Sequence, residues 1–194
     1  MKQKKNIILI CSLLLIGLLL IPNSSGNEAT NDSLKIFTDT TDTFIKITID
    51  FPNPTYIIRT LASDDFSFLI LDDCGYIHDE GKAKLPTLRR MIEIPMDAYP
   101  KIVVNDVIWD QKFLSELDLP KKIYPDQPDT CKKENKSDQY FIDESYYEKN
   151  NFMPEKLFSL QEIKEIRGRR FVIIQINPIQ YNPSTGQIKL MKTC

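Results

Sequence analysis

Phe44–Phe51 has the sequence FIKITIDF, and its alternation of apolar and polar side chains decides the fold class. Apolar side chains occupy every odd position from 45 to 51, and a lysine, a threonine and an aspartate separate them. A period of two places the apolar side chains on one face of a β-strand. Pro52 and Pro54 end the pattern, because proline cannot donate a hydrogen bond to a neighbouring strand.

The rest of the chain contains further short segments of the same kind. Strands are predicted over Leu34–Thr38, Tyr56–Leu61, Phe66–Leu71, Leu88–Ile94, Ile102–Trp109, Phe171–Ile176 and Gln187–Met191. Leu157–Ile166 fits either a short helix or an irregular strand. The turn residues Asn182–Gly186 predict a hairpin that joins Phe171–Ile176 to Gln187–Met191. About eight short strands favour an all-β fold, a β-sandwich or jelly roll, with at most one short helix.

Residues 119–154 differ from the strand-rich parts on either side. They contain prolines at positions 120, 125, 128 and 154, many charged side chains and only scattered aromatic ones. Segments of this composition usually cross the surface of a domain. We predict a long proline-rich surface excursion rather than a separate domain.

The amino terminus has the features of a signal peptide. Lysines among the first five residues precede an apolar run, Ile7–Ile21, and a short polar stretch follows Pro22. This order is typical of secretion, and we expect cleavage after Gly26, with Ala29 as the alternative position. The other interpretation is an uncleaved anchor. A spanning helix needs about 20 apolar residues, whereas this run holds 15.

The predicted organisation is a signal peptide over residues 1–26, a polar leader over 27–33 and one β-rich domain over 34–194. Cleavage after Gly26 would remove three lysines and no acidic residue, which changes the net charge from −2 to −5. A mildly acidic domain without a basic block argues against nucleic acid and against an anionic membrane surface as partners. We predict a secreted protein without membrane contact beyond the signal segment.

Three cysteines, Cys74, Cys131 and Cys194, follow the predicted cleavage site. An odd number leaves at least one thiol unpaired or paired between molecules. Cys74–Cys131 is the candidate disulfide, because Cys194 is the last residue and is expected to be mobile and reactive. The spacing matches no zinc motif, and neither a metal nor another cofactor is predicted.

His78 is the only histidine of the chain and stands four residues after Cys74. Together they could form a nucleophile and its base, or they could be turn residues without chemistry. Cysteine peptidases assemble such dyads from distant segments, so the spacing favours the turn. The sequence contains neither a glycine-rich phosphate loop nor a nucleophile elbow, and we predict no catalytic residue.

Two other groups of residues have a binding interpretation beside a structural one. The acid pairs Asp64-Asp65 and Asp72-Asp73 could bind calcium, but neither has the spacing of a calcium loop and solvated turns explain both. Five aromatic residues could form a sugar-binding platform, or they could anchor the core and the loops. These five are Trp109, Tyr124, Tyr140, Tyr146 and Tyr147.

Two stretches carry a family resemblance. Gly81–Pro95 has the sequence GKAKLPTLRRMIEIP, and Arg167–Ile188 has the sequence RGRRFVIIQINPIQYNPSTGQI. Both resemble the amino-terminal propeptide of the gingipain family of cysteine peptidases, and the resemblance extends over residues 34–194. The matching positions are Gly81, Leu85, Pro86, Pro95, Arg167, Gly168, Pro178, Tyr181, Asn182, Pro183 and Gly186. At the second stretch, prolines fix φ and the tyrosine is expected to anchor a corner to the core.

The resemblance implies a fold and a function. In that family the propeptide is a β-sandwich that precedes the catalytic domain, assists its folding and keeps it latent until it is cut away. A basic side chain on a loop enters the specificity pocket of the enzyme. The candidates here lie within residues 119–154, and each could also be an ordinary solvated lysine. They are Lys121, Lys122, Lys132 and Lys133.

The leading hypothesis is a secreted, non-catalytic domain that assists folding of a gingipain-type cysteine endopeptidase and inhibits it. The partner would be its catalytic domain, in cis from a longer precursor or in trans. The sequence encodes no catalytic domain after Cys194, so we expect a stand-alone protein or the front piece of a truncated precursor. The alternative is a stand-alone extracellular adhesion or carbohydrate-binding module. A third hypothesis is an enzyme that uses Cys74 and His78.

Overall fold

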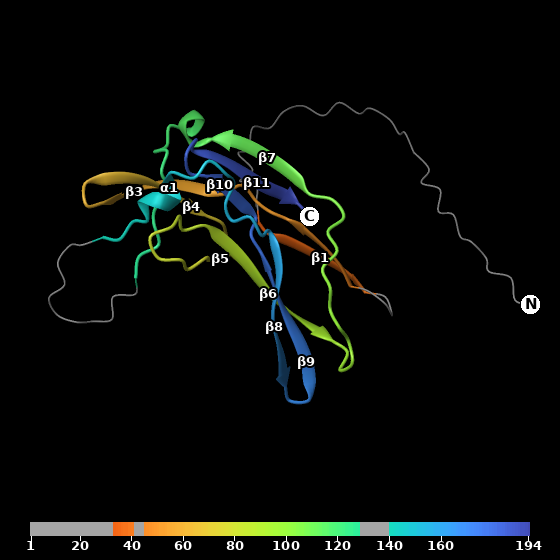
Figure 1. Ribbon diagram of the computed structural model, residues 1–194. Helices are drawn as coiled ribbons and strands as arrows, with labels where there is room; N and C mark the ends of the chain where they lie inside the picture. The colour runs from red at the N-terminus through yellow and green to blue at the C-terminus, as the bar shows by residue number, and fades with distance from the viewer. Residues whose placement is uncertain (1–32, 41–44, 129–139) are drawn as a thin grey trace, which may run out of the picture. The chain divides into compact units, whose positions relative to one another are not determined.

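The computed structural model describes residues 33–40, 45–128 and 140–194, and these residues form antiparallel β-sheets (Figure 1). The strands are β1 (Lys35–Thr40), β2 (Ile45–Asp50), β3 (Thr55–Leu61), β4 (Asp64–Ile70), β5 (Gly75–Tyr76), β6 (Pro86–Ile94), β7 (Ile108–Phe113), β8 (Phe158–Ile166), β9 (Arg169–Ile176), β10 (Ile179–Asn182) and β11 (Gln187–Thr193). A 3₁₀ helix, η1 (Leu114–Leu117), follows β7, and one short α-helix, α1 (Glu144–Tyr147), precedes β8. The predicted all-β fold is therefore confirmed.

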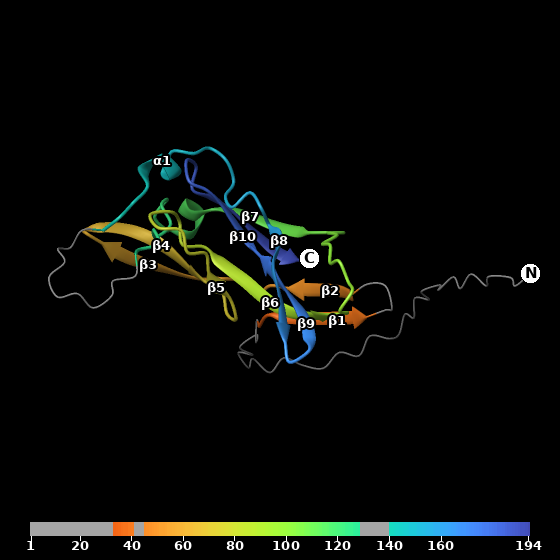
Figure 2. The same ribbon diagram turned by 60° about the horizontal axis from the view of Figure 1, so that its bottom comes forward.

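The strands of the described residues form three sheets. One sheet has the order β1-β2-β11-β10, with β7 paired to β11, and another has the order β5-β6-β9-β8. The strands β3 and β4 form a separate hairpin. In both views the turn of the β8–β9 hairpin lies far from α1 (Figure 1, Figure 2).

A hydrophobic cluster joins the five-stranded sheet to the four-stranded sheet. Ile49 of β2 and Met191 of β11 contact Leu88 of β6 and Ile176 of β9, and all four side chains are buried. Apolar and polar residues alternate along β2 because only one face of this strand contacts the cluster. Two sheets that share an apolar layer in this way form a β-sandwich.

A second cluster lies on the other face of β11. Ile188 and Leu190 of β11 pack with Leu69 of β4 and with Tyr146 and Tyr147 of α1. Since Met191 belongs to the first cluster, β11 is buried on both faces and connects the two halves of the core. The carboxyl end of the chain extends this strand, and the Cys194 N–H donates to the Ile49 carbonyl at 3.1 Å. The expectation of a mobile Cys194 was wrong.

Two of the strand predictions were wrong. The segment predicted over Ile102–Trp109 begins its strand only at Ile108, and the side chain of Val103 is 81% exposed. Branched apolar residues favour a strand only where a partner strand is available, and this segment has none within the described residues. The strand Phe171–Ile176 does not pair with β11 either, because β9 pairs with β6 and β8.

β10 is the strand that precedes the turn and pairs with β11, so the hairpin around Asn182–Gly186 exists with a different first strand. The sequence analysis also missed the β8–β9 hairpin. Its turn is Arg167-Gly168, with φ of 53° and 73°. Positive φ at both central residues is the geometry that matches the twist of a two-residue hairpin. Of the two alternatives for Leu157–Ile166 the irregular strand is correct, with a register shift between Leu160 and Ile163.

Residues 119–154, which we call the central segment, lie between η1 and β8. The structure describes positions 119–128 and 140–154 of it. Three of its side chains, Ile123, Tyr146 and Tyr147, are at most 5% exposed. Asp143 caps α1 by accepting the Tyr146 N–H at 3.1 Å. The central segment therefore supplies part of the core as well as crossing the surface.

Several sequence predictions lie outside the described residues: the signal peptide, most of the polar leader, Cys131, Lys132 and Lys133. Within the part of the chain that the structure describes, no helix is long and apolar enough to cross a membrane.

A pair of isoleucine substitutions tests the assignment of the core. Ile188 is fully buried, whereas Ile58 of β3 is 52% exposed. We expect Ile188→Ala to lower the free energy of unfolding by about 2–5 kcal/mol and Ile58→Ala by less than about 1 kcal/mol. Urea denaturation followed by tyrosine fluorescence measures both. Equal losses would contradict the proposed core.

Candidate functional site

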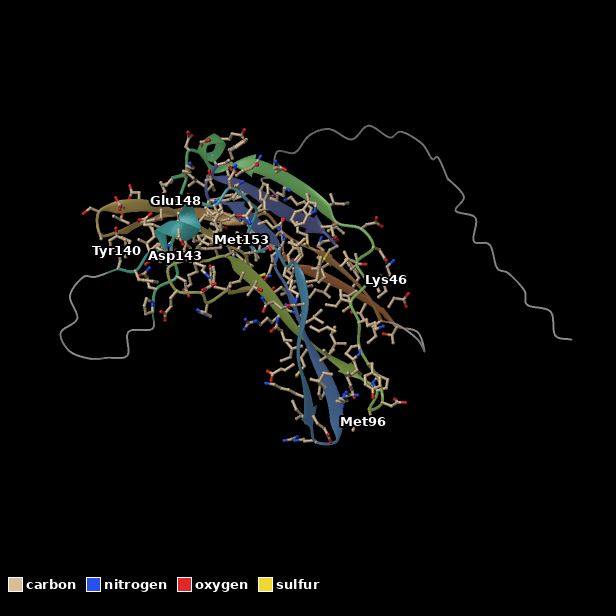
Figure 3. All side chains as sticks on the ribbon, in the orientation of Figure 1. Lys46, Met96, Tyr140, Asp143, Glu148 and Met153 are labelled. Carbon is tan, nitrogen blue, oxygen red and sulfur yellow. The ribbon has the colours of Figure 1, made fainter. Side chains whose placement is uncertain are left out.

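The central segment, which contains the predicted inhibitory lysines, is held at three places. Tyr181 of β10 is fully buried, and its hydroxyl donates to the Lys121 carbonyl at 2.9 Å. The backbone of Tyr181 exchanges two hydrogen bonds of 2.8 Å with Met153, near the other end of the segment (Figure 3). Residues 120–124 run beside β4, where Ser67 donates its N–H to the Lys122 carbonyl at 2.9 Å.

The two described lysine candidates differ in their surroundings. The Lys122 ammonium lies 3.5 Å from the Glu144 carboxylate and 5.6 Å from the centre of the Tyr147 ring. Lys121 has an exposed side chain without an ion pair among the described residues, and its stem lies against Gly186. Lys122 is thus engaged with α1, whereas Lys121 remains available to a partner. Lys132 and Lys133 stay predictions.

Gly81 and Asp126 join the first family motif to the central segment. The Asp126 carboxylate is buried, accepts the Asp79 N–H at 3.1 Å and lies 2.7 Å from the Lys84 ammonium. Gly81 has a φ of 78°, and a Cβ there would stand 2.6 Å from the Phe141 ring. Its N–H donates to the Asp126 carbonyl at 2.8 Å. This glycine therefore permits a close approach that another residue would block.

The other motif positions lie at the ends of strands. Leu85 is buried, Pro86 begins β6, and Pro95 follows its last residue. Arg167 and Gly168 form the β8–β9 turn described above. In the second stretch Pro178 precedes β10, Pro183 lies in the β10–β11 turn, and the Asn182 carbonyl accepts the Gly186 N–H at 2.9 Å. The positions Pro178, Asn182, Pro183 and Gly186 thus set the geometry of the turns that flank β10.

The structure does not bring Cys74 and His78 together as a hydrogen-bonded pair within the described residues. Burial raises the pKa of the Cys74 thiol to about 11, and the described residues show no hydrogen bond between it and His78. The His78 imidazole is 71% exposed and lies 3.4 Å from the Asp126 carboxylate instead. A thiol with a raised pKa is a poor nucleophile because the thiolate is the reactive form. Cys194 is also half-buried, and burial raises its pKa to about 11.

The aromatic residues considered as a sugar platform anchor the core and the loops. Tyr146 and Tyr147 are buried, with ring planes at 81° to one another. Tyr124 contacts Phe66 edge to face, and Trp109 packs on the cluster between the sheets. A sugar platform requires exposed, coplanar rings, and these rings do not form one.

One acid pair begins a strand and the other lies in a turn. Asp64 and Asp65 begin β4, and the Thr60 hydroxyl donates to Asp65 at 2.6 Å. Asp72 and Asp73 follow β4, and Asp73 has a left-handed φ of 61°. Among the described residues no group of three or more acidic, histidine or cysteine side chains could hold a metal ion.

Residues 95–107, which we call the exposed loop, were not identified from the sequence, because part of them was predicted as a strand. The Tyr99 and Val103 side chains are 90% and 81% exposed, and Met96 is 56% exposed. The Arg170 guanidinium holds the start of the loop by donating to the carbonyls of Met96 and Ala98. Met96 lies beside the β8–β9 turn in Figure 3. The signal in the sequence is Pro95 and Pro100, which bracket the start of the loop.

The comparisons with known proteins identify the family. The family model Propeptide_C25 matches residues 28–194, so the chain belongs to the C25 propeptide family, and the predicted resemblance to gingipain propeptides is confirmed. Lys-gingipain from Porphyromonas gingivalis strain ATCC 33277 and Lys-gingipain W83 from the same species are 25% identical over 111 residues. Those residues are 57% of this chain and 6% of each relative, so the match spans a small part of their length.

Two solved structures share the fold. A structure that concerns the zymogenic latency of gingipain K from Porphyromonas gingivalis superimposes with a TM-score of 0.71 at 18% identity, over 85% of this chain and 90% of that chain. A complex of the pro- and mature domains of RgpB from the same species gives a TM-score of 0.70 at 19% identity. That match covers 84% of this chain and 81% of the other. The fold is that of gingipain prodomains.

Two glycines with the same backbone geometry test the contact between Lys121 and the β10–β11 turn. Gly186 and Gly168 have φ of 72° and 73°, but a Cβ at Gly186 would lie 2.7 Å from Lys121 Cγ, whereas one at Gly168 meets nothing within 4 Å. We expect Gly168→Ala to cost about 1 kcal/mol of unfolding free energy, from backbone strain alone, and Gly186→Ala about twice as much. Guanidinium denaturation compares them. A Gly168→Ala variant that loses more than Gly186→Ala would contradict the contact.

Alkylation tests whether Cys74 is built as a nucleophile. Its pKa is raised from 9.0 to about 11, so at pH 8 we expect the thiolate to be about a hundredfold less populated than in the unfolded chain. Iodoacetamide labelling followed by peptide mass spectrometry should show slow modification of Cys74 in the folded protein and fast modification in urea. Labelling in the folded state that matches or exceeds the rate in urea would restore the dyad hypothesis.

Proposed function

We propose that this domain assists the folding of a gingipain-type cysteine endopeptidase and keeps it latent, and that the domain itself is not catalytic. Membership of the propeptide family supports this proposal, as does the prodomain fold. The matched relatives are peptidases named Lys-gingipain, which suggests an enzyme that accepts lysine. The partner is the catalytic domain of such an enzyme, in cis or in trans. Secretion through the predicted signal peptide would bring the two together.

The observation that carries the proposal is the exposed loop. Residues 101–106 all have exposed side chains, and Val103 and Val104 are among them. Contiguous apolar side chains in contact with water usually mark a surface that binds another protein. The exposed loop also belongs to no β-strand, so its backbone is not paired with a strand within the described residues. A peptidase cleft binds its substrates as extended segments. The exposed loop therefore has the composition and the exposure of a segment that docks in such a cleft.

Lys101 is the basic residue of the exposed loop. It stands between Tyr99 and Val103, its side chain is exposed, and it has no ion pair within the described residues. A specificity pocket for lysine requires an ammonium that is free to leave water and meet a carboxylate. Lys122 already lies near Glu144, so it would have to give up that contact first. Lys101 is thus the described lysine best placed to enter the pocket, and Lys121 is the second.

The scaffold around the exposed loop favours inhibition over turnover. Arg170 and Pro95 fix its start, and β7 fixes its end in the five-stranded sheet. A loop that is held at both ends loses little entropy on binding, so more of the contact energy appears as affinity. Held in this way, Lys101 would occupy the pocket of the enzyme and delay cleavage of the adjacent backbone.

Lysine substitutions test the proposal. We expect the purified chain to inhibit a lysine-specific gingipain-type peptidase, and Lys101→Ala to raise the inhibition constant at least about tenfold because a buried ion pair is lost. Lys156→Ala is the control, since this exposed lysine lies outside the exposed loop and the central segment. It should change the constant less than about twofold. Inhibition constants come from initial rates with a chromogenic lysine substrate.

Other outcomes would redirect or reject the proposal. Inhibition that survives Lys101→Ala but is lost in Lys121→Ala or in the double variant Lys132→Ala/Lys133→Ala would move the inhibitory role to the central segment. The absence of inhibition by the unmodified chain at tens of micromolar would reject the inhibitor function. Refolding of the denatured peptidase with and without the chain tests the folding function separately.

A further inference from the structure

A small hollow beside β6, which we call the arginine pocket, lies at the junction of β5 and β6. Its volume is about 240 Å³, and its walls include Asp73, His78, Thr87, Arg89 and Arg90. Arg89 and Arg90 extend from opposite faces of β6 because they are consecutive strand residues. They nevertheless line one hollow, because β5 pairs with β6 only at Pro86 and Thr87 and leaves the next residues as an open edge.

The arginine pocket is lined by two arginines and by one acid, Asp73. Arg89 donates from Nε to the neutral Gln175 amide oxygen at 3.1 Å, and Arg90 donates from Nη1 to the Arg89 carbonyl at 3.1 Å. Neither guanidinium has an ion pair with a carboxylate among the described residues. Arg90 is half-buried, so part of its hydration is already lost. A partly buried guanidinium with free N–H groups is a ready site for an oxygen anion.

Three other arginines of the described chain are engaged. Arg59 lies 3.6 Å from the centre of the Phe68 ring, Arg169 is hydrogen-bonded to Glu93, and Arg170 donates to two backbone carbonyls. The protein contains 27 acidic and 25 basic residues, so carboxylates are not scarce. Arg89 and Arg90 differ from these three because they are adjacent in sequence and line one hollow.

We propose that the arginine pocket binds a carboxylate group. The planar fork of a guanidinium matches the two oxygens of a carboxylate, and two forks can share one such group. Asp73 is the acid that faces the hollow, and its negative charge opposes a phosphate dianion more than a single carboxylate. The inference does not depend on the proposed peptidase inhibition. The carboxylate can come from a small dicarboxylate or from an acidic side chain of a peptide that runs along the open edge of β6.

The only histidine of the chain makes the test simple. His78 lines the arginine pocket, so its imidazole C–H signals report binding without ambiguity in a protein that carries no histidine tag. The probes are glutarate, the blocked tripeptide acetyl-Ala-Glu-Ala-amide, its Gln analogue and inorganic phosphate, titrated at pH 7 and constant ionic strength. We expect saturable shifts with millimolar affinity for glutarate or for the Glu peptide, and none for the Gln peptide.

Substitutions separate the arginine pocket from general charge effects. Arg90→Gln and Arg89→Gln should each weaken binding at least about tenfold, whereas Asp73→Asn should strengthen it by about threefold because a repelling charge is removed. Arg167→Gln is the matched control, since it removes the same charge at the β8–β9 turn, away from the pocket lining. Binding by this variant should match the unmodified chain. Because Asp73→Asn predicts a gain, misfolding cannot imitate the complete pattern.

The results also identify the ligand. Binding of the Glu peptide but not of glutarate assigns the arginine pocket to acidic peptides, and binding of glutarate alone assigns it to small dicarboxylates. Three results would each overturn the proposal: no saturable shift up to 10 mM of either carboxylate, equal binding of the Glu and Gln peptides, or tighter binding of phosphate than of both carboxylates. Equal losses in Arg90→Gln and Arg167→Gln would also overturn it.

Discussion

The rest of the structure depends on the position of Tyr181. Its ring is fully buried in one core cluster, its hydroxyl holds the Lys121 carbonyl, and its backbone holds Met153 through two hydrogen bonds. One residue thus ties both ends of the central segment to β10. Without the hydrogen bonds of Tyr181, the central segment would not be held where Ile123 and Tyr147 can pack in the core. A buried hydroxyl needs a hydrogen-bond partner. The burial of Tyr181 therefore depends on the backbone path of the central segment, and that path depends on Tyr181.

The same constraint explains which parts of the domain are free to act. Both faces of β11 are covered, and the end of the chain is paired with β2 through Cys194. The polar groups of the interior are therefore largely satisfied by the fold itself. Two candidate binding features lie along β6: two arginines at its middle and the apolar exposed loop after its end. Side chains that are not needed for packing within the domain are available to contact a partner.

The sequence predicted the fold class because local patterns determine it. The alternation before Phe51 and the turn residues around Gly186 each specify short strands and tight turns without knowledge of distant residues. The pairing of those strands was harder to predict, since β9 and β11 both lie close in sequence to the turn residues 182–186, and only the structure shows that β9 pairs with β6 and β8 whereas β11 pairs with β10, β7 and β2. The branched residues within 102–107 have the composition of a strand, but among the described residues no strand pairs with this segment. That Arg90 has no ion pair among the described residues likewise depends on the three-dimensional arrangement.

The first family motif gains a physical explanation from this arrangement. The parts of Gly81–Pro95 have different roles: its glycine allows contact with Phe141, its centre supplies two residues of the arginine pocket, and its last proline begins the exposed loop. The two candidate binding features are thus joined by one strand, which β9 pairs from Leu88 to Ile94. A ligand at Arg89 and Arg90 and a peptidase at the exposed loop would both contact β6. Coupling between the two features would require a second arrangement of β6 that a ligand and a peptidase both favour, because contact with the same strand does not by itself couple two sites.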